Sequence, residues 1–384
     1  MTQTVMVFEE PNLEFRYAQR IRDPRDGLSL FGPYDTDKAS HPAAIPYLVI
    51  GTSEGIQKFR IWSGMVNSPA TEAPKNNTRL WPPFPGFEAA FQTKWSTEPL
   101  ISIQIEKDKL LDASRLKDPH QRAHKVVDFY LEGLQKAGIR DEKIGVAICI
   151  VPDEVWQNCR PKSYVTNAIG PQLSSKELAS RKSGQISFLD KDQDTYLLSP
   201  DFRRQLKARA MEYEFPIQIL RDSTLRPNDE NKFGERGLTP LSDRMWNICT
   251  TLYYKCGGKP WRLVTAREGV CYIGLAFRRS DDKRTACCAA QMFLDTGDGI
   301  VFLGQFGPWY SPRDKQFHLT KNAARNLLSG VLKTYQNLDG KPLTEIFLHS
   351  RSEISKEEFE GYQDACPDGV KLVGIRVRPG KNLP

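Results

Sequence analysis

The sequence predicts an α/β protein of 384 residues, in which a loop-rich N-terminal lobe precedes two sheet-containing domains. Two patterns indicate this class. In the middle of the chain, helical and strand segments alternate in the manner of a doubly wound domain. In the last third, three strands are followed by a helix, a strand, a helix and a strand. At about 100–200 residues per domain, the length accommodates two or three domains.

The first 115 residues are rich in proline, glycine and aromatic residues, as in DPRDGLSLFGPY (23–34) and TRLWPPFPGFEAAF (78–91). Proline and glycine mark turns, and the aromatic side chains need burial. An alternating apolar segment, IPYLVIGTS (45–53), predicts a strand. We therefore expect residues 1–115 to form a loop-rich lobe that packs on the domains after it.

Residues 116–258 have the pattern of a doubly wound domain. The apolar positions of 119–137 share one helical stripe, which predicts an amphipathic helix. KIGVAICIV (143–151) is apolar throughout and predicts a buried parallel strand. A helix around 200–213 and a strand at FPIQIL (215–220) follow, so the elements alternate as this class requires.

Residues 259–384 contain the clearest succession of elements, and their order is that of the RNase H-like fold. A tight-turn sequence, TGDG (296–299), connects the second and third strands. The predicted elements are strands at 270–279, 285–295 and 299–307, a helix at 320–336, a strand at 345–350, a helix at 355–365 and a strand at 371–377.

Composition narrows the function classes. Lys and Arg number 54 and Asp and Glu 47, so the net charge is +7, which permits a polyanionic partner without requiring one. No apolar run approaches the ~20 residues of a membrane span, and the N-terminus lacks a secretory pattern. The eight cysteines include no Cys-x-x-Cys pair, which argues against a zinc or disulfide framework. We expect a cytoplasmic protein with reduced thiols and no membrane partner.

The RNase H-like domain lacks the acidic residues of a nuclease. Nucleases of this fold hold two metal ions with carboxylates in the middle of the first strand and at the end of the fourth. Here those positions hold Leu275 and Ser350. Leucine cannot coordinate a metal, and serine is a poor neutral substitute. The sequence thus predicts a nuclease fold without nuclease chemistry, with no catalytic residue and no metal held by side chains.

A doubly wound domain before an RNase H-like domain resembles the MID and PIWI domains of Argonaute proteins. The resemblance is to short prokaryotic Argonautes and covers essentially the whole chain. It implies a Rossmann-like MID domain at 116–258 and a PIWI domain at 259–384. These relatives lack the N and PAZ domains and usually have an inactive PIWI domain. The segments that carry the resemblance are DPRDGLSLFGP (23–33), WPPFPGFEAAF (81–91), FRRQLKARAMEYEFPIQILRDSTL (202–225), YYKCGGKPWRL (253–263) and CCAAQMFLDTGDGIVFLGQFGPWY (287–310).

The resemblance implies a site for the 5′-phosphate of a guide strand, with Arg203, Lys207, Gln218 and Lys255 at the matching positions. The residues themselves are consistent with this. A spacing of four places Arg203 and Lys207 on one helix face, and Gln218 interrupts an apolar strand, where an amide needs partners. Taken alone, the basic pair is more typical of a solvated helix face. Several donors and cations converging on one dianion are what phosphate binding requires.

Three neighbouring positions qualify this site. Thr251 stands where long Argonautes often carry another lysine, which leaves charge neutralisation to Arg203 and to a Mg²⁺ ion at the guide 5′ end. Thr251 and Lys259 are candidates for guide contacts, and Trp261, which like Lys259 follows the Gly-Gly pair, is a further candidate or alternatively a core aromatic. Relatives continue beyond a strand like 371–377, so we expect a PIWI domain that is incomplete at its C-terminus. Either the sequence is truncated or the natural protein is short.

The resemblance implies a catalytically inactive Argonaute that binds a 5′-phosphorylated guide RNA and recognises complementary single-stranded plasmid or phage DNA. Its partner would be an APAZ-domain effector of the TIR or SIR2 type, in a heterodimer that assembles further on activation and depletes NAD(P)⁺. This chain has no glycine-rich dinucleotide fingerprint, so we expect no NAD site in it. The alternative is a guide-independent structural subunit that stabilises an effector. An active nuclease would need carboxylates at Leu275 and Ser350.

Overall fold

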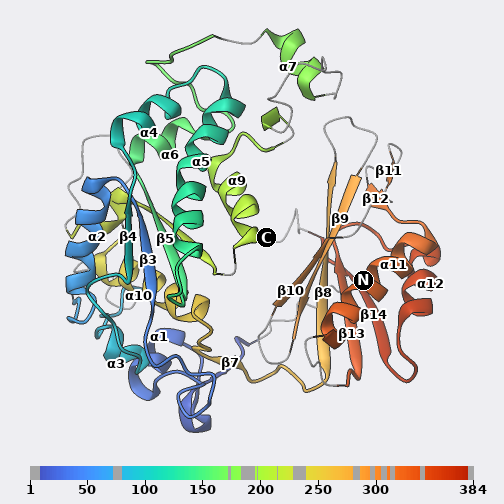
Figure 1. Ribbon diagram of the computed structural model, residues 1–384. Coiled ribbons are helices and arrows are strands. Elements are labelled where there is room, and N and C mark those ends of the chain that lie inside the picture. Colours follow the sequence, from blue (N-terminus) through green and yellow to red (C-terminus); the bar gives the residue numbers. More distant parts are fainter. Residues whose placement is uncertain are drawn as a thin grey trace, which may run out of the picture. The chain divides into compact units, whose positions relative to one another are not determined.

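The computed structural model describes residues 9–71, 80–171, 174–182, 195–196, 198–213, 215–227, 239–279, 286–294, 299–303, 309–311, 316–337 and 342–378. The chain divides into two compact units (Figure 1). We call Leu13–Trp261 the N-terminal unit, and Arg262–Pro384 together with Met1–Asn12 the C-terminal unit.

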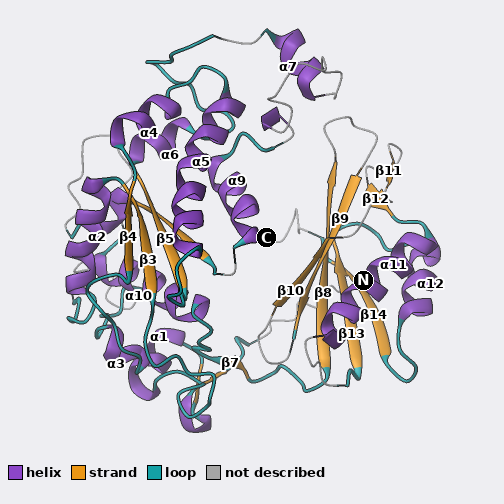
Figure 2. Ribbon diagram, in the orientation of Figure 1, coloured by secondary structure: helices purple, strands orange, loops and turns teal. Residues whose placement is uncertain are grey.

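The N-terminal unit is built on a parallel four-stranded sheet in the order β4-β3-β5-β6. Its strands are β3 (Tyr47–Gly51), β4 (Ile101–Gln104), β5 (Val146–Val151) and β6 (Ile217–Arg221). Every residue of β3 and β5 is buried, because helices cover both faces of the sheet (Figure 2). The continuous apolar run 143–151 is therefore the central strand that its composition predicts.

Two aromatic and aliphatic layers enclose this sheet. One layer contains side chains of α2, α3 and α10, and the other contains those of α4, α5 and α9. The helices of this unit are α1 (Pro24–Phe31), α2 (Ser53–Met65), α3 (Phe87–Phe91), α4 (Lys107–Ser114), α5 (Pro119–Gly138), α6 (Asp153–Asn158), α7 (Ser175–Lys182), α9 (Phe202–Arg209) and α10 (Leu241–Lys255), with 3₁₀ helices at η1 (Arg16–Ala18), η2 (Ala210–Glu212) and η3 (Asp222–Leu225).

The expected N-terminal lobe supplies half of this sheet. Strands β3 and β4 come from residues 1–115, and β5 and β6 come from 116–258, so the division near residue 115 falls inside one sheet. The aromatic residues of the first range are buried as their number requires. Phe84, Phe87 and Phe91 are fully enclosed in the layer that contains α10. The two ranges thus share one core, because β3 needs a neighbour on each edge and cover on each face.

The C-terminal unit contains a five-stranded sheet in the order β10-β9-β8-β13-β14. In this sheet β9 is antiparallel to both β8 and β10, whereas β13 is parallel to both β8 and β14. Numbered along this unit, the sheet order is third, second, first, fourth, fifth, which confirms the RNase H-like topology. The strands are β8 (Val270–Arg279), β9 (Ala286–Phe293), β10 (Gly299–Leu303), β13 (Glu345–Ser350) and β14 (Lys371–Arg376).

Two helices, α11 (Lys321–Asn337) and α12 (Lys356–Ala365), supply apolar side chains to the core beside this sheet. They pack closely where Gly361 faces Lys321, since a Cβ at Gly361 would stand 2.2 Å from the Lys321 carbonyl oxygen. The remaining short strands are β11 (Trp309–Ser311) and β12 (Gln316–His318), which pair with each other, and β1 (Leu13–Glu14), β2 (Arg20–Ile21) and β7 (Arg262–Leu263). Residues 296–298 of the predicted turn lie outside the described residues. Over the part of the chain that the structure describes, no helix is long and apolar enough to span a bilayer.

Candidate functional site

Two of the predicted anchoring residues are in direct contact. Lys255 is the last residue of α10 and Gln218 is the second residue of β6. The Lys255 Nζ donates to Gln218 Oε1 at 2.7 Å and also to the backbone carbonyl of Ile217. The Gln218 Nε2 donates to the Ile219 carbonyl at 3.3 Å, so both ends of the amide have a partner. The polar residue that interrupts this apolar strand therefore orients the lysine ammonium.

The other two predicted residues bring positive charge to the same place. Arg203 and Lys207 are exposed residues of α9, one helical turn apart. Burial, followed by the positive charges of Lys207 and Arg203, lowers the pKa of Lys255 to about 8. Burial and the charge of Arg203 also lower the pKa of Lys207. A cation lowers the pKa of another only when the two are close, so these three side chains form one cluster.

Among the residues that the structure describes, no carboxylate forms an ion pair with this cluster. Within the described part of the chain, no salt bridge joins Arg203, Lys207 or Lys255 to a carboxylate. The nearby thiol of Cys149 is fully buried, and burial raises its pKa to about 12, so it is neutral at pH 7. Like charges held together without a counterion oppose one another, and a bound anion would relieve that repulsion. We call Arg203, Lys207, Gln218 and Lys255 the cationic cluster.

Local packing fixes the register of α9. The side chain of Asp201 caps the helix by accepting from the Arg204 backbone N–H at 2.9 Å. Phe202 and Leu206 are buried in the layer beside α5, and the Phe202 and Tyr130 ring centroids are 5.6 Å apart. With the apolar side of the helix held against the core, the side chains of Arg203 and Lys207 are left exposed.

The two glycines after Lys255 have a packing role. Gly257 has a φ of +91°, a backbone conformation that favours glycine. A Cβ at Gly258 would stand 2.4 Å from the Tyr253 ring, so only glycine lets the chain close on that ring. The chain thus turns sharply at the end of α10, directly after the lysine.

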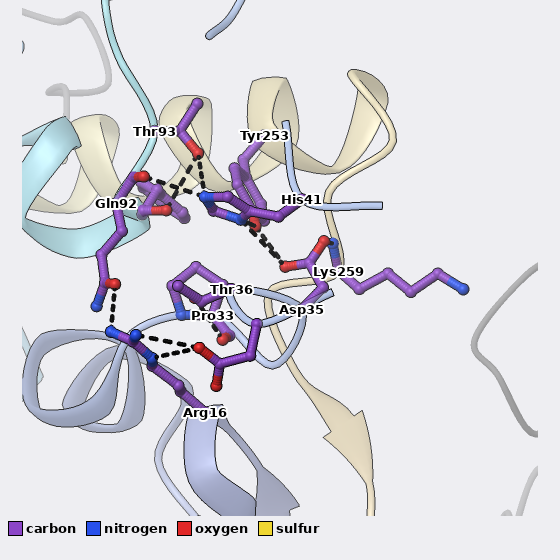
Figure 3. Close-up of polar contacts among 11 residues, drawn as sticks. Arg16, Pro33, Asp35, Thr36, His41, Gln92, Thr93, Tyr253 and Lys259 are labelled. Atoms are coloured by element: carbon purple, nitrogen blue, oxygen red, sulfur yellow. Dashed lines mark hydrogen bonds and ion pairs between the residues drawn. The ribbon is translucent and has the colours of Figure 1, made fainter. Parts of the chain in front are cut away.

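The two further candidates for guide contacts contribute in different ways. The Thr251 hydroxyl donates to the Asn247 carbonyl at 2.7 Å within α10, so it brings a neutral side chain whose hydrogen is already committed. The Lys259 backbone N–H donates to Asp35 Oδ2 at 2.8 Å, and its side chain extends away from that carboxylate (Figure 3). Trp261 packs partly against the core layer that contains α10.

A cavity of about 210 Å³ lies next to the cluster, and none of the sequence patterns described above predicted it. The Arg160 and Arg221 guanidinium carbons lie 5.6 and 5.8 Å from the centroid of the Trp156 ring. The signal was present, because Trp156 follows the carboxyl end of the central strand β5, where open α/β sheets bind ligands. The cavity is lined by Trp156, Cys159, Arg160, Asp201, Phe202, Arg203 and Arg204.

In the C-terminal unit, the two degenerate positions are neighbours. Leu275 on β8 and Ser350 on β13 are direct partners in the sheet, and they are 8% and 3% exposed. Arg376 on β14 is the next partner of Ser350. Its Nη1 donates to Glu353 Oε2 at 2.7 Å and its Nη2 to Gln316 Oε1 at 2.8 Å. This row of three thus contains an apolar, a neutral and a cationic residue. Over the described residues, no three His, Cys, Asp or Glu side chains are grouped to hold a metal ion.

The fold is similar to that of Argonaute proteins of known structure. A structure of Clostridium butyricum Argonaute bound to a guide DNA with a 5′ deoxycytidine and a 19-mer target DNA matches 97% of this chain, with 16% identity and a TM-score of 0.51. This chain covers 39% of that protein, so it spans well under half of its length. The likeness confirms an α/β fold of the MID and PIWI type.

Two further structures match more loosely. Aa-Ago with externally bound siRNA matches 94% of this chain and 39% of its own, with 11% identity and a TM-score of 0.44. Drosophila Piwi matches 90% of this chain and 34% of its own, with 12% identity and a TM-score of 0.43. No protein-family model and no curated protein matches the sequence.

Proposed function

We propose that this chain is a catalytically inactive short Argonaute that binds the 5′-phosphate of a guide RNA and recognises complementary single-stranded DNA. The observation that supports this most directly is the cationic cluster. Arg203 and Lys207 on α9 and Lys255 on α10 act on one another electrostatically, and Gln218 on β6 orients the last of them. A 5′-phosphate carries about 1.5 to 2 negative charges near neutral pH and matches such a cluster.

The geometry leaves the lysine able to bind. An ammonium has three N–H donors. Lys255 uses two of them, on Gln218 Oε1 and on the Ile217 carbonyl, which leaves one for a ligand oxygen. The Arg203 guanidinium offers a planar fork of donors that suits phosphate oxygens. Lys207 adds a point charge from the same helix face. The bound phosphate is thereby held by charge-assisted hydrogen bonds.

The side chains of the cluster do not fit a magnesium ion. Mg²⁺ needs hard oxygen ligands at nearly octahedral positions. The side-chain oxygen in the cluster is Gln218 Oε1, and it accepts from Lys255. The three cations around it would repel a metal ion. The side chains present therefore do not fit a metal, and a Mg²⁺ ion at the guide 5′ end would be held by phosphate oxygens of the guide itself.

The neighbouring cavity fits the first nucleotide of the guide. Arg203 belongs to both the cluster and the cavity, so a phosphate on the cluster directs its nucleoside toward Trp156. Aromatic rings stack on nucleobases with little dependence on sequence, and arginine guanidinium planes add to this. The cavity would therefore hold a terminal base without selecting strongly for its identity.

The C-terminal unit would grip a target without cutting it. The row of Leu275, Ser350 and Arg376 offers no pair of carboxylates for the two metal ions of nuclease chemistry. In guide-dependent systems, base pairing reads the sequence while the protein holds backbone and shape. Recognition of a complementary strand then requires no catalytic residue in this chain.

The partner we propose is an APAZ-domain effector of the TIR or SIR2 type, and this part of the proposal is supported by the sequence resemblance. Pairing of guide and target would activate the effector, which would deplete NAD(P)⁺ in defence against plasmids and phages. A ligand can shift the partner's state only by binding the two states differently. The NAD-consuming chemistry would belong wholly to the partner.

The test is binding of matched RNAs that differ only at the 5′ end. The full chain is copurified with the product of its neighbouring gene, and the affinities for 5′-phosphate and 5′-hydroxyl RNA of one sequence are compared. We expect a preference for the phosphate that Lys207→Ala with Lys255→Ala abolishes. A matched control is Lys125→Ala with Lys136→Ala, which removes the same charge from exposed positions of α5. Equal binding of both RNAs by the intact complex would favour the guide-independent subunit instead.

A further inference from the structure

A buried carboxylate from a distant part of the sequence grips the turn that follows Lys255. Asp35 is fully buried. Its Oδ1 accepts from the Tyr253 hydroxyl at 2.5 Å and its Oδ2 accepts from the Lys259 backbone N–H at 2.8 Å (Figure 3). Tyr253 precedes Lys255 by two residues and Lys259 follows it by four. One carboxylate thus ties the last turn of α10 to the segment that leaves it.

The turn closes directly on the tyrosine that Asp35 holds. The Gly258 backbone N–H donates to the Tyr253 carbonyl at 3.1 Å, and Gly258 lies against the Tyr253 ring. The Tyr34 backbone N–H donates to the Pro260 carbonyl at 3.1 Å, next to the Asp35 contacts. A change in the position of the ring would therefore move the whole turn.

His41 completes the network. Its Nδ1 lies 3.0 Å from the Tyr253 hydroxyl oxygen and its Nε2 lies 3.0 Å from the Gln92 carbonyl oxygen. A carbonyl only accepts, so Nε2 carries a hydrogen. The Tyr253 hydroxyl donates to Asp35 Oδ1, so the tyrosine links the histidine ring to the buried carboxylate.

The backbone beside the network is strained where His41 grips it. Gln92 has a φ of +53°, in the left-handed region that non-glycine residues rarely adopt. Its carbonyl accepts from His41, and its side-chain oxygen accepts from Arg16 Nη1 at 2.7 Å (Figure 3). Strained backbone persists where its surroundings hold it firmly. The network is therefore a rigid support at one end of α10.

We propose that Asp35, Tyr253 and His41 are positioning residues for Lys255, because they fix the end of α10 and so place the ammonium over the phosphate site. This inference rests on the proposed phosphate-binding function. The two hydrogen bonds from Lys255 to the Ile217 carbonyl and to Gln218 join α10 to β6. They can form only when the last turn of the helix lies at the right distance from the strand. The final turn of a helix frays readily, since its last carbonyls lack intrahelical partners.

The experiment uses Tyr253→Phe and Asp35→Asn, with Tyr47→Phe as the matched control. Tyr47 on β3 is also fully buried, and its hydroxyl donates to the Ser96 carbonyl at 2.8 Å. The quantity measured is the phosphate preference, meaning the dissociation constant of 5′-hydroxyl RNA divided by that of 5′-phosphate RNA. Losing one oriented hydrogen bond at the turn should lower this preference by about fivefold. Tyr47→Phe should lower thermal stability while leaving the preference unchanged.

The pH profile of the preference adds a readout that general destabilisation would not change. Burial is the main reason for the low pKa of Lys255. If the turn loosens and the lysine moves toward solvent, the midpoint of the pH profile should rise in Tyr253→Phe and stay fixed in Tyr47→Phe.

The outcomes separate this inference from the proposed function. Absence of any phosphate preference in the unchanged protein would refute the function. A preference that Lys255→Gln removes, but that Tyr253→Phe and Asp35→Asn leave intact with the same pH midpoint, would overturn the positioning role alone. If Asp35→Asn does not fold, Tyr253→Phe decides, because it keeps the ring that Gly258 packs against.

Discussion

The Nζ of Lys255 and the Oε1 of Gln218 are 2.7 Å apart, and this contact joins the end of α10 to the edge strand β6. The amide oxygen orients the ammonium without neutralising it, whereas a carboxylate at the same place would do both. An oriented cation that keeps its charge is what an anion site requires. Glutamine at this position therefore leaves the charge of Lys255 available to an anion, whereas a carboxylate would form a structural ion pair with it.

This contact gives a prediction for Gln218→Glu, which keeps the side-chain shape and adds a negative charge. We expect affinity for 5′-phosphate RNA to fall by tenfold or more, because the new carboxylate would pair with Lys255 and repel the phosphate. Thermal stability should rise by a few degrees, since a partly exposed ion pair adds at most about 1 kcal/mol. Calorimetry and RNA titration measure the two effects. The control is Gln104→Glu at the exposed end of β4. A variant that binds phosphate normally would contradict the assignment.

Phosphate binding should weaken as the pH rises through the pKa of Lys255. Burial, with the charges of Lys207 and Arg203, lowers this pKa to about 8. The ammonium form is therefore present below that pH in the free protein and is lost above it. A bound dianion favours the ammonium, so binding takes up a proton at higher pH. We expect affinity to decrease by up to about tenfold per pH unit above the pKa. Titrations at about pH 7 and about pH 9 with 5′-phosphate RNA, and with 5′-hydroxyl RNA as reference, measure this; parallel curves would count against it.

Trp156→Ala should weaken binding of both the 5′-phosphate and the 5′-hydroxyl RNA. The ring lines the cavity beside Arg203, and stacking of a base on an aromatic side chain contributes about 1–3 kcal/mol by alanine substitution. The expected loss is therefore about tenfold, with the ratio between the two RNAs preserved. Trp156→Phe, which keeps an aromatic face, should retain most of the affinity. Normal binding by the alanine variant would show that the first base does not occupy this cavity.

Leu275 should behave as a core residue. Its side chain is 8% exposed and belongs to the apolar cluster of the C-terminal unit. We expect Leu275→Ala to lower the free energy of unfolding by about 2–4 kcal/mol through the cavity that it leaves. Leu263→Ala, at a position that is 41% exposed, is the reference substitution. Denaturant unfolding measures both.

Incubation of the unchanged protein with guide, complementary DNA and divalent metal should give no cleavage products, and specific cleavage would refute the inactive assignment.

Much of the fold could be predicted from the sequence because its elements are regular. The stripe of 119–137 becomes α5, and the apolar run of 143–151 contains β5. The position of residues 45–53 within the sheet could not be predicted in the same way. Periodicity identified a strand there, but nothing local says that β3 pairs with β5, which lies about a hundred residues further along the chain. Pairing between distant strands is set by the shared core rather than by local pattern.

The candidate site, like the fold, could be predicted from the sequence only in part. Lys255 and Gln218 could be proposed because a family pattern aligns them, and the structure places them in contact. Asp35 could not be proposed, since it and Tyr253 are 218 residues apart and its own neighbours, GPYDTDK, have the composition of a surface turn. Burial, which the sequence does not display, distinguishes a turn aspartate from one that holds a helix end.

The alignment of Leu275, Ser350 and Arg376 across three adjacent strands has an evolutionary consequence. Acquiring a metal centre here would need acidic residues at both 275 and 350, and each change alone would place a carboxylate at a position that is at most 8% exposed. An unpaired buried charge is strongly destabilising. Each single substitution toward such a centre would therefore pass through a less stable protein.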